Sequence, residues 1–166
     1  MIAIRRLSAD AWSDFREMRL LALRSEPGLF YRSAAEDAEL NEADWRALLA
    51  DEKHRIFGVF DGERLVGITA ALTARTDPSG RTAVLGMSFL RPEYRRRGLA
   101  HDLYRVRMEW IRGAGRFARA TVSHRRSNEA SRRAIERAGF AQVGVEPHTW
   151  PDGGEEDDLL YELRLE

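Results

Sequence analysis

The order of chain reversals in this sequence restricts the fold to a mixed β-sheet. Residues 56–60 and 65–68 are two short apolar runs, and Asp61-Gly62 lies between them. An Asp-Gly pair tolerates the positive φ angles that tight hairpin turns require, so the two runs are expected to pair as antiparallel strands. The front half of the chain therefore predicts an antiparallel sheet.

The middle of the chain shows a second kind of reversal. Residues 82–90 form an apolar run, a helical stripe begins at about Leu99, and residues 117–122 form the next apolar run. Strand, helix and strand in this order usually connect parallel strands. Further apolar runs that fit strands are residues 3–7, 141–145 and 159–165. The whole pattern predicts an α/β (α+β) fold: a mixed, mostly antiparallel central sheet of about seven strands, flanked by helices.

Helices are expected where a polar cap precedes apolar residues at helical spacing. Asp10, Asn41 and Asn128 are the expected N-caps of three helices, because their short polar side chains can bond the free N–H groups of a first turn. Gly113 and Gly115 are expected to end the long central helix.

Length and composition favour one domain inside the cell. The chain has 166 residues, of which 43% are hydrophobic, enough for one sizeable core and too few for two independent domains. No apolar run approaches the roughly 20 residues that span a bilayer, and the N-terminus lacks the pattern of a signal peptide. We expect a single domain over residues 1–166, in the cytoplasm.

The residue types present exclude several kinds of chemistry. Cysteine is absent, which excludes disulfides, thiolate nucleophiles and thiolate metal sites, and the four histidines lack metal-ligand spacing. The 27 basic residues are balanced by 27 acidic ones, so no net field attracts nucleic acid or an anionic membrane. We expect no metal, no nucleic acid and no membrane partner.

The most informative segment runs from a buried strand through a basic turn into a helix. Arg95, Arg96, Arg97 and Gly98 form the turn, and Ala100 follows at the start of the helix. A helix N-terminus leaves N–H groups unpaired and carries about half a positive charge, so phosphate binds there readily. Gly98 lacks the side chain that would keep a pyrophosphate away from the backbone. The segment is therefore suited to a pyrophosphate-bearing cofactor.

A second motif separates a cofactor site from an ordinary solvated basic turn. Alone, the hexapeptide R-x-x-G-x-A that begins at Arg95 fits either interpretation. Together with its lead-in, Pro-Glu-Tyr-Arg at residues 92–95, it resembles motif A of the GCN5-related N-acetyltransferase (GNAT) superfamily. Residues 128–140, an Asn-capped helix that ends in Gly-Phe, resemble motif B of the same family. The resemblance extends to the whole predicted order of elements.

This resemblance implies a cofactor and its position. In the family, the pantetheine arm of coenzyme A (CoA) lies in a splay between the fourth and fifth strands, which here corresponds to the backbone near Phe89 and Leu90. The residues expected to bind acetyl-CoA are Phe89, Leu90, Arg95, Arg96, Arg97, Gly98, Leu99, Ala100 and Asn128. For Asn128 the alternative is a helix cap and nothing more, although one side chain can serve both roles.

The acid of the implied reaction is not in its usual place. Acetyl transfer from a thioester to an amine requires protonation of the leaving thiolate. Many family members place a tyrosine near the sulfur, at the position of Ile135 in this sequence, so that acid is missing. Ser131 lies one helical turn earlier on the same face and is the expected substitute, as in branches that resemble the ribosomal-protein acetyltransferases. A serine that only bonds its own backbone is the alternative.

The base is also not in its usual place. Family members often use a glutamate on the fourth strand, but residues 84–89 contain no carboxylate. His124, at the end of the predicted fifth strand, has a reference pKa of about 6.5 and is the remaining candidate. A histidine with both nitrogens already bonded is the alternative.

The acceptor side is expected between the front helices and the late hairpin, as the resemblance implies. The aromatic residues Phe30, Tyr31 and Trp150 would line it and suit a partly apolar amine, although core packing explains them equally well. The acidic run at residues 155–158 fits a solvated loop better than a binding site. A small-molecule or peptide amine is the expected partner, and exposed strand edges leave a homodimer open.

Two functions of different classes fit these residues. The first is an acetyl-CoA-dependent N-acetyltransferase that transfers the acetyl group directly, in a ternary complex. The second is a CoA-binding regulator or sensor with the same fold and little turnover, suggested by the missing tyrosine and the missing strand carboxylate. A nucleic-acid-binding domain that uses the arginine turn is disfavoured by the neutral net charge.

Overall fold

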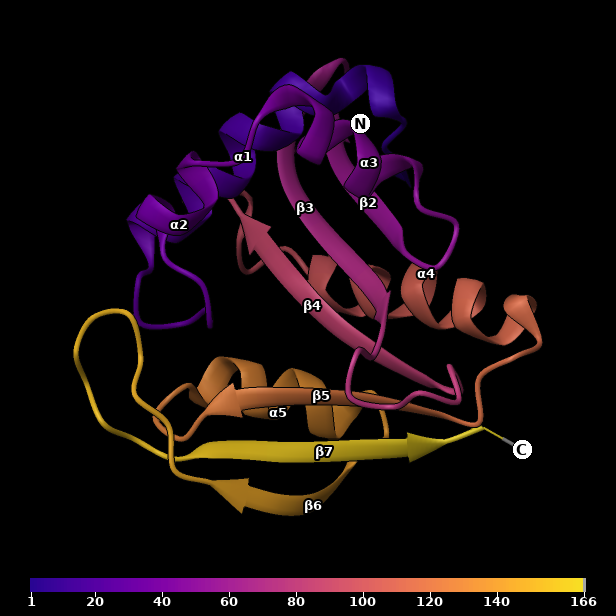
Figure 1. Cartoon of the computed structure of the whole chain (residues 1–166), viewed down its shortest axis with the longest axis vertical. Coiled ribbons are helices and arrows are strands. Elements are labelled where there is room, and N and C mark those ends of the chain that lie inside the picture. The colour runs from indigo at the N-terminus through magenta and orange to yellow at the C-terminus, as the bar shows by residue number, and fades with distance from the viewer. Residues whose placement is uncertain (166) are drawn as a thin grey trace.

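The computed structural model describes residues 1–165, which form a sheet with strand order β1-β2-β3-β4-β5-β7-β6 and helices on both faces (Figure 1). The strands are β1 (Ile2–Arg6), β2 (Arg55–Asp61), β3 (Arg64–Thr73), β4 (Thr82–Leu90), β5 (Arg119–Arg125), β6 (Ala141–Glu146) and β7 (Asp158–Arg164). The α-helices are α1 (Trp12–Ser25), α2 (Ala34–Ala38), α3 (Glu42–Ala50), α4 (Leu99–Ala114) and α5 (Glu129–Arg137). Short 3₁₀ turns occupy Ala9–Ala11 and Pro92–Tyr94.

The predicted mixed sheet is confirmed. Every strand pair is antiparallel except β4 with β5, which are parallel and joined by α4. Among residues 1–165, no helix is long and apolar enough to cross a membrane. The β2–β3 hairpin turns at Gly62, whose φ of +60° is one that glycine adopts without strain.

Two polar caps act as the sequence predicts. The side chain of Asn41 accepts a hydrogen bond from the N–H of Asp44, and the carboxylate of Asp44 accepts one from the N–H of Asn41. This reciprocal capping box fixes the start of α3. Asn128 likewise accepts from the N–H of Ser131 at the start of α5.

Other local predictions need correction. Asp10 lies inside a 3₁₀ turn and makes no cap, because the chain enters α1 through that turn. Gly113 lies inside α4, and only Gly115, with a φ of +69°, ends the helix. Helix α2 was not expected, although Ser33 and Glu36 form a complete capping box at its start.

Clusters of buried hydrophobic residues cover both faces of the sheet. Under α1 and α3, Phe15 and Trp45 pack edge to face, with ring centroids 5.5 Å apart, against buried residues of β2, β3 and β4. On the other face, Ile111 of α4 and Ile135 of α5 pack against β3, β4, β5 and β7. The helices are thus divided, with α1 to α3 on one face and α4 and α5 on the other (Figure 1).

The centre of the sheet is open on one side of its parallel pair. Strands β4 and β5 pair only where residues 82–84 face residues 119–121. Beyond these three pairs the strands diverge, so that residues 85–90 and 122–125 have no strand partner between them (Figure 1). The splay that the family resemblance implies is therefore present, and the unpaired edges of both strands line it.

Candidate active site

The turn between β4 and α4 presents an uncapped helix N-terminus. Gly98 is the N-cap of α4, with a φ of +76° and no side-chain cap, so the first N–H groups of the helix have no capping partner. A Cβ at Gly98 would meet no atom within 4 Å, and Ala100 is exposed beside it. Open space, free donors and the helix dipole together fit a phosphate group.

Arg95 points away from this helix start. Its Nε donates to the carbonyl oxygen of Leu90 at 2.9 Å, and its Nη1 pairs with Glu26 at 3.0 Å. The guanidinium carbon lies 5.3 Å from the ring centroid of Phe89. Arg95 therefore ties the turn to the end of β4 and to the chain just after α1.

Arg96 and Arg97 remain available to an anion. Both are exposed, and neither forms an ion pair within residues 1–165. The guanidinium of Arg97 lies over the ring of Tyr94, whose hydroxyl donates to Asp61 at 2.6 Å and so anchors the turn to the β2–β3 hairpin. This hydrogen bond also lowers the pKa of Asp61. Leu99 buries its side chain beneath the turn, which leaves only its backbone at the helix start.

A bulge lies on β4 beside the splay. Thr69 of β3 faces both Met87 and Ser88 of β4, and the Thr69 and Ser88 hydroxyl oxygens are 2.7 Å apart. Met87 has a φ of +57°, a strained value for a residue with a side chain. Next along β4, Phe89 buries its side chain and Leu90 is half-buried, so their contribution to the splay is mainly backbone.

Gly86 leaves room on the face of the splay that α1 and α3 cover. It pairs with Ala70, whose side chain lies in the core under α1 and α3, so a side chain at position 86 would point to that same face. A Cβ built there would meet no atom within 4 Å. Such open space in the middle of a central strand is unusual, because protein interiors are close-packed.

The start of α5 brings Asn128 and Ser131 together. The amide oxygen of Asn128 accepts from the N–H of Ser131 at 3.2 Å, and its amide nitrogen donates to the Ser131 hydroxyl at 3.0 Å. The Ser131 oxygen is therefore an acceptor, and its own hydrogen is free to be donated elsewhere. Ile135, one turn later, is buried in the core.

His124 has both ring nitrogens engaged. Nδ1 lies 2.7 Å from the carbonyl oxygen of Arg125, which can only accept, so Nδ1 carries the proton. Nε2 lies 3.0 Å from the Tyr161 hydroxyl, within hydrogen-bond distance. His124 is buried on the α4–α5 side of the sheet, which corresponds to the alternative of a satisfied histidine.

Two of the three expected acceptor residues meet. The ring of Tyr31 is 5.7 Å from that of Trp150 and 4.9 Å from that of His148, centroid to centroid. His148 and Trp150 are 4.5 Å apart. Phe30 instead packs against the core under α1, with the Arg19 guanidinium 5.4 Å from its ring.

A buried carboxylate lies beneath Tyr31. The Tyr31 hydroxyl is 2.6 Å from the Ser123 hydroxyl and donates to Oδ2 of Asp158, which is only 3% exposed. Burial raises the pKa of Asp158, and the hydrogen bonds from Tyr31 and Ser123 oppose that rise. Sequence reasoning missed Asp158 because it ends an acidic run that otherwise fits a solvated loop.

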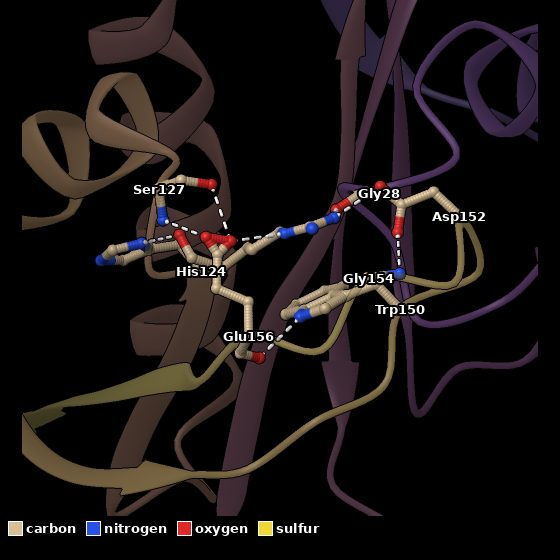
Figure 2. Close-up of polar contacts among 8 residues, drawn as sticks. Gly28, His124, Ser127, Trp150, Asp152, Gly154 and Glu156 are labelled. Carbon is tan, nitrogen blue, oxygen red and sulfur yellow. Dashed lines mark hydrogen bonds and ion pairs between the residues drawn. The ribbon is translucent and has the colours of Figure 1, made fainter.

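Arg125 joins the two loops that carry these aromatic residues. It donates to the carbonyl oxygen of Gly28 at 3.0 Å, to Asp152 at 2.8 Å and to Glu156 at 2.7 Å (Figure 2). A Cβ at Gly28 would lie 2.6 Å from an Arg125 nitrogen, and one at Gly154 would lie 2.4 Å from another. A side chain at either position would have to displace the ends of the Arg125 and Asp152 side chains, a relationship that the sequence shows only as two loop glycines.

The sequence and the fold agree on one family. Residues 12–140 match the family model described as the acetyltransferase (GNAT) family. The chain belongs to the GNAT acetyltransferases. No curated protein sequence matches this GNAT chain.

Solved GNAT structures share its fold along the whole chain. A GNAT acetyltransferase from Streptococcus pneumoniae superposes with a TM-score of 0.84 at 15% identity, covering 100% of both chains. The putative acetyltransferase yncA from Salmonella typhimurium, solved with its cofactor acetyl-CoA, gives 0.84 at 15% identity, covering 100% of this chain and 95% of its own. A ribosomal-protein-S5-alanine acetyltransferase from Vibrio fischeri gives 0.79 at 16% identity, covering 98% and 92%.

Proposed function

We propose that this GNAT protein is an acetyl-CoA-dependent N-acetyltransferase that acetylates a primary amine of a small molecule or peptide by direct transfer in a ternary complex. The observation that carries the proposal is the splay between β4 and β5, which leads to the uncapped start of α4 at Gly98. One opening thus combines free strand edges, suited to an extended amide-bearing arm, with free helix N–H groups, suited to a pyrophosphate.

The residues at the turn fit two different roles in CoA binding. The exposed Arg96 and Arg97 would hold the pyrophosphate together with the backbone from Gly98 to Ala100, whereas Arg95 would hold the turn in place. The backbone of Phe89 and Leu90 would line the arm. Bound acetyl-CoA supplies the acetyl group as a reactive thioester.

Ser131 is the proposed acid for the leaving thiolate. Its hydroxyl accepts from the Asn128 amide, which leaves its hydrogen to donate. Accepting a hydrogen bond polarises the hydroxyl and favours donation of its proton. Asn128 would then act as cap and positioning residue at once, and we assign no proton transfer to His124 because its nitrogens are engaged within the core.

Calorimetric titration with acetyl-CoA and with CoA tests the proposal. We expect wild-type protein to bind both, and Gly98→Val to lose binding because its side chain blocks the helix start. Gly80→Val is the matched control: Gly80 has a similar φ of +72° and equal open space, but lies in the loop before β4. Equal losses in the two variants, or no binding by the wild type, would contradict the proposal.

A thiol-release assay with a panel of primary amines then separates enzyme from sensor. Release of free CoA that depends on both acetyl-CoA and an amine supports the acetyltransferase. Tight binding without release from any amine would favour the CoA-binding regulator, the function that the core position of Ile135 suggests.

A further inference from the structure

Two buried polar atoms on the acceptor side have no partner. They are Oδ1 of Asp158 and Nε2 of His148, neither of which makes a hydrogen bond within residues 1–165. Folded proteins rarely leave such atoms unsatisfied, so a partner outside the chain is the natural explanation. Both atoms belong to residues that surround Tyr31.

Asp158 lies close to the open edge of β5. It pairs with Arg125 across the β5–β7 ladder, and residues 122–125 of β5 line the splay. The Tyr31 hydroxyl bonds both Ser123, on that edge, and Asp158. One strand therefore separates the Asp158 carboxylate from the opening where the acetyl group is proposed to lie.

The surroundings of Asp158 suit a cation on an apolar stem. The rings of Tyr31, His148 and Trp150 lie within 5.7 Å of one another, and aromatic faces attract cations. Arg125, the partner of Asp158 across the ladder, is already bonded to two other carboxylates. Tyr31 is 55% exposed and covers the buried Asp158, so the aromatic cluster borders solvent through Tyr31.

We propose that Asp158 binds the ammonium group of the acceptor and takes its proton. This deepens the proposed acetyl transfer and rests on it. The three N–H groups of a primary ammonium satisfy Oδ1 of Asp158 and, with neutral imidazole, Nε2 of His148. The acceptor class is thus a primary alkylammonium with an apolar or aromatic stem.

In the balanced reaction, Asp158 accepts one proton from the acceptor. The ammonium gives one proton to the Asp158 carboxylate, and the neutral nitrogen forms a bond to the thioester carbonyl carbon. As the carbon–sulfur bond breaks, its electron pair leaves on sulfur, which takes the Ser131 proton. The second amine proton and the Asp158 proton pass to water, and Ser131 regains one proton from water. One proton is released in total.

The groups that face Asp158 determine the pKa of its carboxyl group. Burial is the largest influence and raises its pKa; Glu146, its neighbour on β6, raises it further. The hydrogen bonds of Tyr31 and Ser123 lower it, and the charge that His148 carries only when protonated would lower it further. A carboxyl group whose pKa is raised accepts a proton more readily than one with the ordinary value.

A matched pair of acceptors tests this assignment. Phenethylamine is an ammonium ion at neutral pH, whereas its isostere O-benzylhydroxylamine is neutral and needs no base to free its lone pair. We expect Asp158→Asn to lower kcat/KM for phenethylamine by about 100-fold or more, and to change that for O-benzylhydroxylamine only a few-fold. Glu155→Gln, which removes an exposed charge from the same loop, should change neither.

The outcomes separate the two proposals. Equal losses on both acceptors, or no loss on either, would overturn the role of Asp158 while leaving the acetyltransferase intact. A wild-type protein that binds acetyl-CoA but acetylates no amine overturns both. If Asp158→Asn does not fold by circular dichroism, Tyr31→Phe replaces it. Losing the Tyr31 hydrogen bond raises the pKa of Asp158. The acid limb of the pH dependence of kcat/KM for phenethylamine must therefore move to higher pH. An acid limb that does not move would overturn the proposal.

Discussion

The guanidinium of Arg125 donates to the carbonyl oxygen of Gly28, 97 positions earlier in the chain, at 3.0 Å. Because the same guanidinium bonds Asp152 and Glu156, it holds the loop after α1 against the loop between β6 and β7. Tyr31 and Trp150, one on each loop, lie with their ring centroids 5.7 Å apart and their planes tilted by 32°. A single side chain from β5 thus joins the two loops of the proposed acceptor side.

Removing this side chain should damage acceptor binding selectively. We expect Arg125→Met to lower kcat/KM for the acceptor by up to about 100-fold, because small displacements of positioning groups have effects of that size. The dissociation constant of acetyl-CoA, measured by calorimetry, should stay unchanged. Arg126→Gln, which removes an exposed ion pair with Asp157, is the control and should behave as wild type.

The exposed arginines of the turn should contribute to CoA binding. Each charge-assisted hydrogen bond to a phosphate is worth about 1.5–3 kcal/mol, so Arg96→Ala and Arg97→Ala should each weaken binding about tenfold or more. The loss should shrink as salt increases. Arg105→Ala, on a part of α4 where the arginine pairs with Asp102 and Glu109, should leave binding intact. Unchanged binding in all three variants would contradict the assigned phosphate site.

Ser131→Ala should lower kcat without altering acetyl-CoA binding. Loss of a general acid typically slows turnover about 100-fold or more. Arg133→Ala, an exposed change on the same helix, serves as the control. Turnover by Ser131→Ala equal to wild type across pH would remove the hydroxyl from the mechanism.

The buried Asp158 makes a prediction about stability. Its pKa is raised on folding from the ordinary value of 3.8, so the unfolded chain releases this proton at lower pH than the folded protein does. The free energy of unfolding should therefore fall as pH rises from about 3.8 through the raised pKa. Asp158→Asn lacks this contribution and should melt no lower than wild type at neutral pH. A much lower melting temperature would indicate a structural role for the charge instead.

Two glycines at the end of α4 should respond oppositely to alanine. Gly113 lies inside the helix, and a Cβ there would meet no atom within 4 Å, so Gly113→Ala should stabilise the fold by about 0.4–1 kcal/mol. Gly115 has a φ of +69°, which a side chain strains, so Gly115→Ala should destabilise it. Denaturant unfolding measures the change in the free energy of unfolding of each variant, which should be positive for Gly113→Ala and negative for Gly115→Ala.

Strand β4 and the start of α4 were predictable because several signals coincide there. The run at residues 82–90 and the helical stripe from about Leu99 both agree with the observed bounds. Helix α2 has only five residues, too few for periodicity to appear, and only its capping box at Ser33 could have revealed it. Short elements of this kind are fixed by local hydrogen bonds and tertiary contacts.

The site was predictable only where backbone chemistry defines it. The open helix start at Gly98 was predictable from the glycine that precedes the helical stripe, and the helix periodicity places Ser131 one turn before Ile135. Asp158 was not predictable, because a run of four acidic residues does not show which one turns inward. The ladder decides it: Asp158 pairs with Arg125 and Glu146 on one face, under the Tyr31 loop.

The splay also divides the sheet into two halves that share few hydrogen-bonded pairs. Strands β1 to β4 and strands β5 to β7 form two half-sheets joined by only three residue pairs, between residues 82–84 and 119–121. An arm of CoA that lies between the half-sheets would occupy the place between β4 and β5 where a further strand could otherwise pair. Amide hydrogens on the unpaired edges of β4 and β5 should then exchange more slowly with solvent when CoA is bound. Both half-sheets should show this protection at the same concentration of CoA.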